Sequence, residues 1–309
     1  MLKTSYRWLM GIIGLALVIL VGYVWLVTVD ETETTSGVAT VSETEATNTN
    51  LQPDGKLRVI FLDVGQGGSQ LLISPSGKTM LIDAGNNDKE QVMVDYLKKY
   101  HIERLDLIVG THPDADHIGG LDKVIDYASV GKIYMPKVSS TTKTFESVLE
   151  SVKNKSLQVQ TAKAGLSLEW DKSVKLEMIA PVETYGDPNN MSAVIKVTFG
   201  STSFLLTGDA EAASEKDMLK SGVDLSATVL GVGHHGSKSS TSLAFLKQVN
   251  PKYAVIQSGK DNNYGHPEKT ILSRLTKAGA EVFRNDLQGT VTLVSDGNQV
   301  SVATERKAK

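Results

Sequence analysis

Residues 111–120 read THPDADHIGG and come directly after an apolar run. His112, Asp114, Asp116 and His117 place four metal-binding or titratable side chains within six positions, and two glycines follow. On a solvated loop such a stretch is a polar turn built around aspartates. At the end of a buried strand it predicts a metal site, because imidazole and carboxylate groups are common ligands of divalent metals.

The other candidate residues also follow short β-rich runs. Five of the six histidines of the chain fall into such positions. Loops at strand ends carry function because a rigid scaffold aims them. We therefore expect the following groups to converge: Asp83 after TMLI, His112 after LIVGT, Asp209 after FLLTG, His234 and His235 after VLGVG, and His266 after AVIQSGKDNNYG.

A two-metal site needs several imidazole and carboxylate ligands, and one carboxylate commonly bridges the ions. In an extended loop alternate residues point to the same side, which groups His112 with Asp114 and leaves Asp116 and His117 for a second centre. Other strand ends supply the rest: Asp209 as the bridge, His235 for the second centre, and Asp83 as an acceptor that holds the histidine loop.

Simpler roles remain open for several of these residues. Asp209 stands before AEAASEK and fits a turn or a helix N-cap equally well. The stretch HHGSKSS fits a serine-rich loop, and His266 before Pro267 fits the cap of a turn. Only the whole set of motifs favours the metal site.

The chain from residue 56 onward alternates strand and helix patterns. The segment 88–100 predicts a helix that packs through Val92, Val94, Tyr96 and Leu97. Strands outnumber helices, so the simplest packing is two sheets face to face, each covered by helices. We expect strands at 57–64, 69–74, 79–85, 105–111, 131–136, 173–181, 192–200, 202–209, 226–233, 252–259, 280–286, 289–295 and 299–305, and helices at 88–100, 120–128, 145–155, 210–222, 241–249 and 267–279.

Taken together, FLDVGQGGSQLLI, LIDAG, THPDADHIGG, FLLTGD, VGHHGSKSS and NNYGHP resemble the metallo-β-lactamase fold. More closely, they resemble the extracellular hydrolase domain of ComEC-type competence proteins, over about residues 56–305. The resemblance implies an α/β fold, the αββα four-layer sandwich, with a metal site at one edge of the two sheets. It implies one or two divalent ions, Zn²⁺ or Mn²⁺.

By the same resemblance, six residues are metal ligands: His112, Asp114, Asp116, His117, Asp209 and His235. His234 would contact the phosphate of the substrate, while His266 and Lys238 would stabilise the leaving oxygen or the phosphate. Asp83 and Asn190 would support the ligands, and Asp116 or Asp209 would orient the attacking hydroxide.

Three positions depart from the broader family pattern. Many members have histidine where this chain has Asp114, and another histidine where it offers Asn190, whereas ComEC-type domains share both features. The first centre is therefore rich in oxygen, which favours Mn²⁺ beside Zn²⁺. The familiar motif DVGQGD ends here in Gly68, so the activity could be altered.

The N-terminal segment predicts a membrane anchor. Residues 8–27 carry no charge and, as a helix, would span about 30 Å, the thickness of the hydrocarbon core. Lys3 and Arg7 precede this run and only acids follow it, which places the rest of the chain outside the cell. We expect a transmembrane helix over 1–29, a flexible acidic Thr/Ser-rich linker over 30–55 and the hydrolase domain over 56–309. Cleavage as a signal peptide is the alternative, and it would release a secreted protein.

Composition limits the partners. Two of the 32 basic and six of the 35 acidic residues lie before residue 56, so the remainder has 30 and 29 and is nearly neutral. This gives no broad electrostatic footprint for nucleic acid. The absence of cysteine excludes disulfides, a thiol nucleophile and cysteine-ligated zinc. No protein partner is evident.

These observations predict a membrane-anchored extracellular metallohydrolase, a phosphodiesterase or nuclease that acts through a metal-bound hydroxide. The substrate would be a phosphodiester, with DNA as one candidate. A teichoic-acid or lipid phosphodiester or a lactone could use the same site, whereas a β-lactam fits the oxygen-rich centre poorly. A non-catalytic surface-binding module of the same fold is the alternative from another class. The channel-forming helices of complete competence proteins are absent from this sequence.

Overall fold

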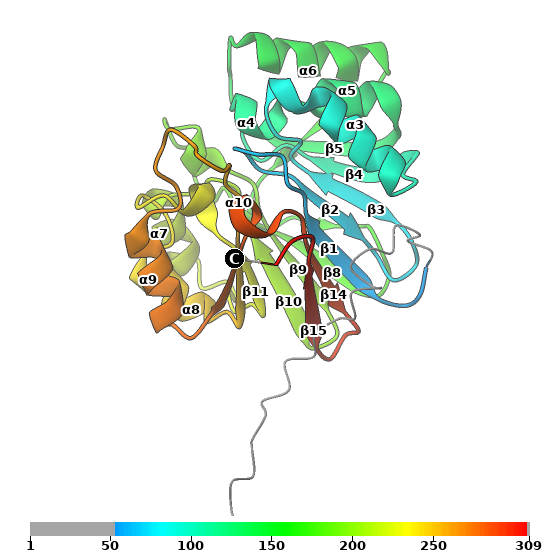
Figure 1. Cartoon of the computed structure of the whole chain (residues 1–309). Coiled ribbons are helices and arrows are strands. Elements are labelled where there is room, and N and C mark those ends of the chain that lie inside the picture. The colour runs from blue at the N-terminus through cyan, green and yellow to red at the C-terminus, as the bar shows by residue number, and fades with distance from the viewer. Residues whose placement is uncertain (1–52, 308–309) are drawn as a thin grey trace, which may run out of the picture. The chain divides into compact units, whose positions relative to one another are not determined.

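The computed structural model describes residues 53–307, which form two β-sheets packed face to face (Figure 1). The first sheet has the strand order β15-β14-β1-β2-β3-β4-β5-β6. Its strands are β1 (Leu57–Phe61), β2 (Gln70–Ile73), β3 (Thr79–Ile82), β4 (Arg104–Val109), β5 (Ser129–Pro136), β6 (Val159–Ala162), β14 (Val291–Ser295) and β15 (Val300–Thr304).

The second sheet has the strand order β13-β12-β11-β10-β9-β8-β7. Its strands are β7 (Ser167–Leu168), β8 (Val174–Ala180), β9 (Val194–Phe199), β10 (Thr202–Leu206), β11 (Val229–Gly231), β12 (Tyr253–Ile256) and β13 (Glu281–Arg284).

Helices cover the outer face of each sheet, as Figure 1 shows. The first sheet carries α3 (Glu90–Lys99), α5 (Leu121–Tyr127) and α6 (Lys143–Asn154), and the second carries α7 (Ala212–Lys220), α8 (Leu243–Val249) and α9 (Lys269–Lys277). Short turns of helix are α4 (Ala115–Ile118), α10 (Asn285–Gln288), η1 (Asn87–Lys89), η2 (Asn189–Met191) and η3 (Gly233–Gly236). The layers are helix, sheet, sheet, helix, so the predicted four-layer αββα sandwich is confirmed.

Apolar residues on both faces of the central strands hold these layers together. In β1, Val59 and Phe61 point into the core between the sheets, while Ile60 points to the core under the helices. In β4, Leu107 points into the core between the sheets, and Ile108 points to the core under the helices. A strand buried on both faces must be apolar throughout, which explains why these segments carry continuous rather than alternating hydrophobic runs. Burying each such side chain fully contributes about 1.5–3 kcal/mol.

The strand directions bring the functional loops to one edge. The strands β3, β4 and β5 are parallel to one another, and so are β10, β11 and β12. Parallel neighbours end at the same edge of a sheet, so the loops after β3 and β4 and those after β10, β11 and β12 each gather. Between the two sets the sandwich holds the candidate site.

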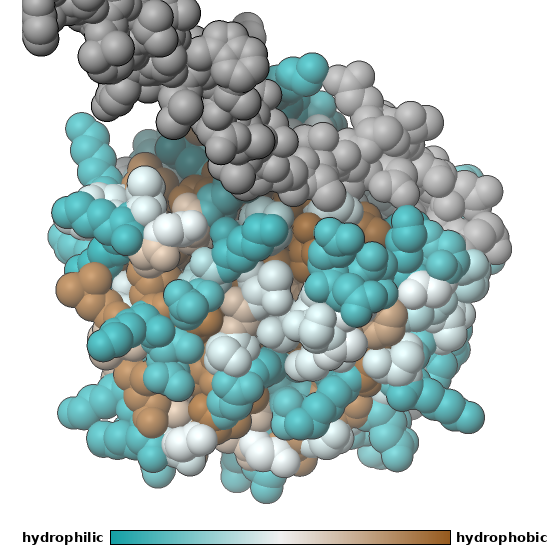
Figure 2. All heavy atoms as spheres, turned by 90° about the horizontal axis from the view of Figure 1, so that it is seen from below, coloured by the Kyte–Doolittle hydropathy of each residue, from teal (hydrophilic) through white to brown (hydrophobic). Residues whose placement is uncertain are grey.

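The surface does not collect into one apolar region on the face seen in Figure 2, where hydrophilic side chains alternate with smaller hydrophobic areas. The predicted membrane helix (1–29) and nearly all of the predicted linker (30–55) lie outside the described residues. Within residues 53–307, none of the helices combines the length and the apolar character needed to cross a bilayer.

Candidate metal centre

The loop after β4 folds differently from our expectation of an extended loop. Asp114 itself is extended (φ −73°, ψ 145°), but the residues after it form a single helical turn, α4. This turn brings His117 back onto His112, with ring centroids 4.2 Å apart. His117 therefore belongs to both halves of the site, whereas the extended-loop prediction gave it to the second centre alone. The predicted neighbours, His112 with Asp114 and Asp116 with His117, do lie together.

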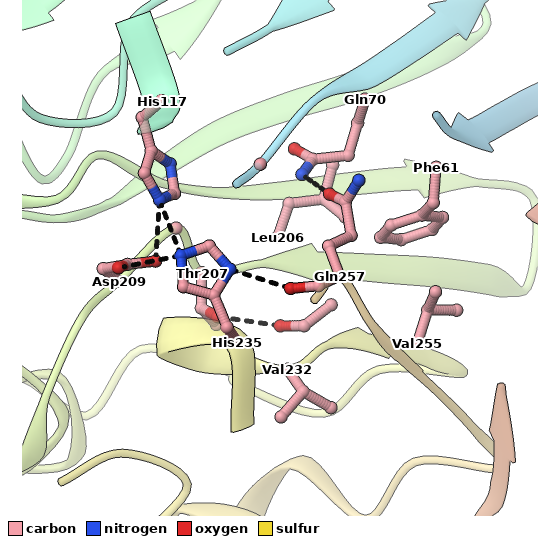
Figure 3. A pocket seen from close by; sticks show the side chains of 13 residues that line it. Phe61, Gln70, His117, Leu206, Thr207, Asp209, Val232, His235, Val255 and Gln257 are labelled. Carbon is pink, nitrogen blue, oxygen red and sulfur yellow. Dashed lines mark hydrogen bonds and ion pairs between the residues drawn. The ribbon is translucent and has the colours of Figure 1, made fainter. Parts of the chain in front are cut away.

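Asp209, directly after β10, is the centre of the cluster. Its Oδ1 lies 3.1 Å from Nε2 of His117, and its Oδ2 lies 3.4 Å from Nε2 of His235. The same Oδ2 is 3.6 Å from Nε2 of His234 and 4.0 Å from Nε2 of His112. One buried carboxylate thus faces four imidazoles from two sheets, which is the placement expected of a bridging ligand. Figure 3 shows its contacts with His117 and His235.

Two groups of side chains have the geometry to hold a cation in the described part of the chain. His112, His117 and Asp209 form one, and Asp116, His117 and His235 form the other, with the ligand atoms of each group within 4.8 Å of one another. Asp114, the remaining predicted ligand, lies beside them: its Oδ2 is 3.8 Å from Nε2 of His112, and its side chain is 48% exposed. The structure therefore brings all six predicted ligands together.

The hydrogen bonds made by the Nδ1 atoms of the histidines are those expected when Nε2 binds a metal. Nδ1 of His117 lies 2.7 Å from Oδ2 of Asp83, and Nδ1 of His235 lies 2.8 Å from the carbonyl oxygen of Gln257. Both partners only accept, so each neutral ring carries its proton on Nδ1 and directs the lone pair of Nε2 into the cluster. Nε2 of His112 is buried with no hydrogen-bond partner among the described residues. A divalent cation would satisfy all three nitrogens.

Charge and burial shift the pKa values of the cluster. Burial alone would lower the pKa of His235, but the carboxylates of Asp209 and Asp116 raise it to about 9. Burial and the neighbouring His117 lower the pKa of His112 to about 4. Burial would raise the pKa of Asp116, whereas its bond with His235 lowers it to about 2. A cation competes with protons for these imidazoles, so its affinity rises with pH.

Asp83 lies where the sequence placed it, behind the histidine loop. It accepts hydrogen bonds from the backbone N–H and the hydroxyl of Thr111, both at 2.7 Å, besides the bond from His117. The residue is fully buried and adopts a left-handed conformation with φ of 58°. Such a strained backbone persists only where the surroundings hold it, which here are the bonds to the loop.

The turn after β11 presents two histidines through an unusual backbone. His234 (φ 48°, ψ 49°) and His235 (φ 54°, ψ 20°) are both left-handed and lie between two glycines in η3. This costs about 1–3 kcal/mol per residue. As a result, His235 points into the cluster while His234 stays at its rim, partly exposed.

The remaining predicted site residues lie at different distances from the cluster. The ring of His266 is near it, with its centroid 5.6 Å from that of His234. Lys238 is exposed, and among residues 53–307 no contact ties its side chain to the cluster. Asn190 is buried but turns toward α7: its Oδ1 accepts from the backbone N–H of Ser214 at 3.0 Å.

Sequence reasoning missed several residues that orient the ligands. Ser192, before β9, lies 3.1 Å from the backbone nitrogen of Asp209, from which it accepts, and 3.4 Å from Nδ1 of His112. Glu211 approaches Nδ1 of His234 at 3.0 Å. The proximity of Glu211 to Asp209 in the chain was the only available signal, since a lone serine before a strand carries none.

A small pocket of about 20 Å³ lies behind the cluster, between it and the sheet core (Figure 3). Gly68 forms one wall, and Gln70 and Gln257 are hydrogen-bonded to each other on the other side. Gln257 also donates to the carbonyl oxygens of Leu62 and Ser69, so it joins β12 to the loop after β1. The back of the site is therefore a fixed polar wall.

Comparison with known proteins identifies relatives. The family model described as Metallo-beta-lactamase superfamily matches residues 64–260, more than half of the chain. The ComE operon protein 3 of Bacillus subtilis (strain 168) is 32% identical over 253 residues, which are 75% of this chain and 32% of that protein. The competence protein ComA of Neisseria gonorrhoeae is 33% identical over 240 residues, 77% of this chain and 32% of that protein.

The chain thus spans about a third of the length of these two relatives. Among solved structures, CmlA, a diiron β-hydroxylase from Streptomyces venezuelae, superimposes with a TM-score of 0.53 at 13% identity, covering 77% of this chain and 54% of that one. At this identity the likeness concerns the fold alone.

Proposed function

The chain belongs to the metallo-beta-lactamase superfamily, with relatives among competence proteins, and from this premise we propose that it is a metal-dependent phosphodiesterase or nuclease. The family resemblance of its motifs is confirmed, and this fold holds divalent metals. The observation that carries the proposal is the ring of four histidine Nε2 atoms around Asp209.

The residues would divide the work as follows. Asp83 and the carbonyl of Gln257 fix the two inner imidazoles, so that the ligand set is formed before a cation arrives. A divalent cation bound there lowers the pKa of a water molecule and polarises a phosphoryl oxygen. Asp116 or Asp209 would accept a hydrogen bond from the attacking group and orient it.

His234 and His266 would act on the phosphate. Glu211 at 3.0 Å from Nδ1 holds the ring of His234, so its Nε2 can donate to a phosphate oxygen at the rim of the cluster. Nδ1 of His266 is buried without a partner among the described residues, so the ring would have to turn to present this nitrogen to the leaving oxygen. Lys238 would reach the phosphate only by moving its exposed side chain.

The ion would be Mn²⁺ or Zn²⁺, at one or two positions. Three of the six candidate ligands are carboxylates, and oxygen ligands suit Mn²⁺ while imidazoles suit both metals. The names of the two relatives point to competence, which makes DNA one candidate substrate.

A metal-screened assay tests the proposal. The full chain, purified in detergent, should cleave bis-p-nitrophenyl phosphate or DNA after reconstitution with Mn²⁺ or Zn²⁺. Asp116→Ala should lose at least about 100-fold in kcat, because it removes a group that binds or orients at the reacting centre. A folded protein without turnover under any metal would contradict the proposal.

Two alternatives have separate outcomes. Hydrolysis of a teichoic-acid or lipid phosphodiester, or of a lactone, in preference to DNA would keep the site and change the substrate. A native protein that contains no stoichiometric metal would favour a non-catalytic surface-binding module.

We propose further that residues 1–29 anchor the chain in the cell membrane with the catalytic domain outside, joined through the linker at 30–55. The support is the uncharged run at 8–27 with basic residues before it and acids after it. Because the chain has no cysteine, Ser36→Cys creates a single label site. An impermeant maleimide should label it in intact cells, and labelling only after lysis would reverse the topology.

A further inference from the structure

Tyr264 is an aromatic side chain that the fold leaves in solvent beside the candidate metal centre. The residue is 68% exposed, although the backbone around it is fixed. Oδ1 of Asn262 accepts hydrogen bonds from the N–H groups of Tyr264 and His266, both at 3.1 Å. An exposed ring on a fixed loop binds a ligand with little further loss of entropy.

This loop is attached to the turn that carries the cluster histidines. The backbone N–H of Glu268 donates to the carbonyl oxygen of Gly236 at 3.0 Å. Gly236 also packs so closely on Pro267 that a Cβ there would lie 2.6 Å from the ring. The position of Tyr264 relative to His234 and His235 is therefore set by the fold.

Three rings form a stack that leads outward from the cluster. The ring of His266 lies between His235, at 6.4 Å and 26°, and Tyr264, at 5.8 Å and 23°. Offset stacking at such separations is the arrangement that aromatic rings favour. The inner ring, His235, belongs to the cluster, and the outer ring, Tyr264, is 68% exposed, so one more planar group could stack on it.

A polar groove of about 400 Å³ begins at the same loop. Gly259, Lys260 and Asn262 line it. Its other cations, Lys89 and Arg306, are paired with aspartates, whereas Lys260 has no acidic partner within salt-bridge distance among residues 53–307. The groove therefore offers one available cation, Lys260, while its three aspartates, Asp63, Asp88 and Asp286, are each paired with a basic side chain.

The geometry points to Tyr264 as the platform on which a nucleobase stacks while a phosphodiester further along the same strand lies at the cluster. This inference rests on the proposed phosphodiesterase function and names its substrate class as single-stranded nucleic acid. Stacking tolerates any base and contributes in proportion to the number of bases held. In a nearly neutral domain it would supply the affinity that phosphate contacts do not.

Other phosphodiesters do not use this feature. A teichoic-acid or lipid phosphodiester has no planar ring to place on Tyr264, so the side chain would add nothing specific to its binding. The ratio between a base-bearing and a base-free substrate therefore isolates the role of the ring.

Binding is tested first, without catalysis. The full chain in detergent and EDTA is titrated against a fluorescein-labelled single-stranded dT oligomer, and anisotropy gives the Kd. Tyr264→Ala and Tyr264→Leu should each raise the Kd about 5- to 150-fold, the value of one stacked base, and Tyr264→Phe should retain wild-type binding. Tyr127→Ala, at another exposed tyrosine on α5, is the matched control and should change nothing.

Hydrolysis is tested second, with the metal-loaded enzyme. The ratio of kcat/KM for the dT oligomer to that for glycerophosphoglycerol should fall about 5- to 150-fold in Tyr264→Ala, mainly through KM. An unchanged Kd in Tyr264→Ala, wild-type binding by Tyr264→Leu, or an equal fall on both substrates would overturn the inference. If no phosphodiester is cleaved but the Kd still depends on Tyr264, the proposed function fails and the stacking site stands.

Discussion

Gly68 lies against the ring of His117 with no side chain between them. A Cβ at this position would be 2.9 Å from both Cε1 and Nδ1 of His117 and 3.5 Å from Oδ2 of Asp83. The first two separations are shorter than carbon atoms tolerate, so any side chain here must displace the bond that fixes the imidazole. Gly68, the residue that departs from the family motif, therefore lets the ring of His117 pack directly against the backbone.

Gly68→Ala should weaken metal binding. The added methyl group pushes His117 away from Asp83, and losing such an orienting bond typically costs 10- to 100-fold in metal affinity. Overpacking should also lower the free energy of unfolding by about 1–3 kcal/mol. Competition with a fluorescent chelator measures the affinity, and urea denaturation measures the stability.

Gly186→Ala is the matched control, because a Cβ at Gly186 meets no atom within 4 Å. Gly186→Ala should leave both the metal affinity and the free energy of unfolding unchanged. Wild-type metal affinity in Gly68→Ala would show that His117 shifts without loss of its ligand geometry.

At the scale of the elements, most sequence patterns predicted the correct element, helix or strand. The loop after β4 is the exception, because it was expected to be extended and contains the helical turn α4. The helix predicted over 88–100 is present as η1 and α3, yet Met93 and Leu97 are its buried residues and Val92 is exposed. The strand β6 was missed, since only Ala162 of its four residues is buried. Short elements with little apolar periodicity give no signal, and α4, with four residues, is one of them.

The strand β9 carries a polar residue inside its apolar run. The ammonium group of Lys196, whose side chain is 7% exposed, donates to the carboxylate of Asp224 at 2.8 Å and to its backbone carbonyl at 2.9 Å. The bond from Lys196, together with the hydrogen bonds from the hydroxyl and backbone N–H of Ser226, lowers the pKa of the exposed Asp224 to about 2. The pair thus satisfies the one cation that β9 buries.

Asp224→Asn should reduce stability in a pH-dependent way. A carboxylate with a lowered folded pKa binds fewer protons in the folded state, so its contribution is present above the unfolded pKa of about 3.9 and is lost as pH falls toward 2. The difference between wild type and variant should be below about 1 kcal/mol at pH 7, because Asp224 is exposed, and should vanish only below about pH 2. Urea denaturation across this range measures it.

A double-mutant cycle provides the control. In a Lys196→Met background, Asp224→Asn should have a smaller effect on stability than in the wild type, because the cation is gone and only the hydrogen bonds from Ser226 remain. A pH-independent difference in the wild-type background would assign the effect to packing instead of to charge.

At the scale of the whole molecule, the candidate metal centre joins the two sheets. His112, Asp116 and His117 come from the first sheet, and Asp209 and His235 come from the second. The same edge also joins β12 to the first sheet through the side chain of Gln257. A cation held by ligands from both sheets binds only the assembled sandwich, so binding and folding are coupled.

Metal binding should therefore raise the Tm. A cation at 100 times its Kd stabilises the folded state by about 2.7 kcal/mol, which for a body of this size corresponds to roughly 5–11 °C. Differential scanning fluorimetry with Mn²⁺, Zn²⁺ and EDTA measures the shift. Asp209→Asn should abolish it, and a Tm that is the same in metal and in EDTA would speak against a site shared by the sheets.

The sequence by itself determined the layered α/β architecture, the strand ends that carry function and the identity of the six candidate ligands, because hydrophobic periodicity and residue chemistry are local properties. It also placed Asp83 behind the histidine loop, because Asp83 directly follows a buried strand, although its left-handed backbone is not a local signal. Only the tertiary structure decided which histidine serves both halves of the cluster, and that Ser192, Glu211 and Gln257 orient it. Those contacts join residues up to 195 positions apart, as between Gln257 and Leu62, and depend on how two sheets pack, which no local pattern encodes.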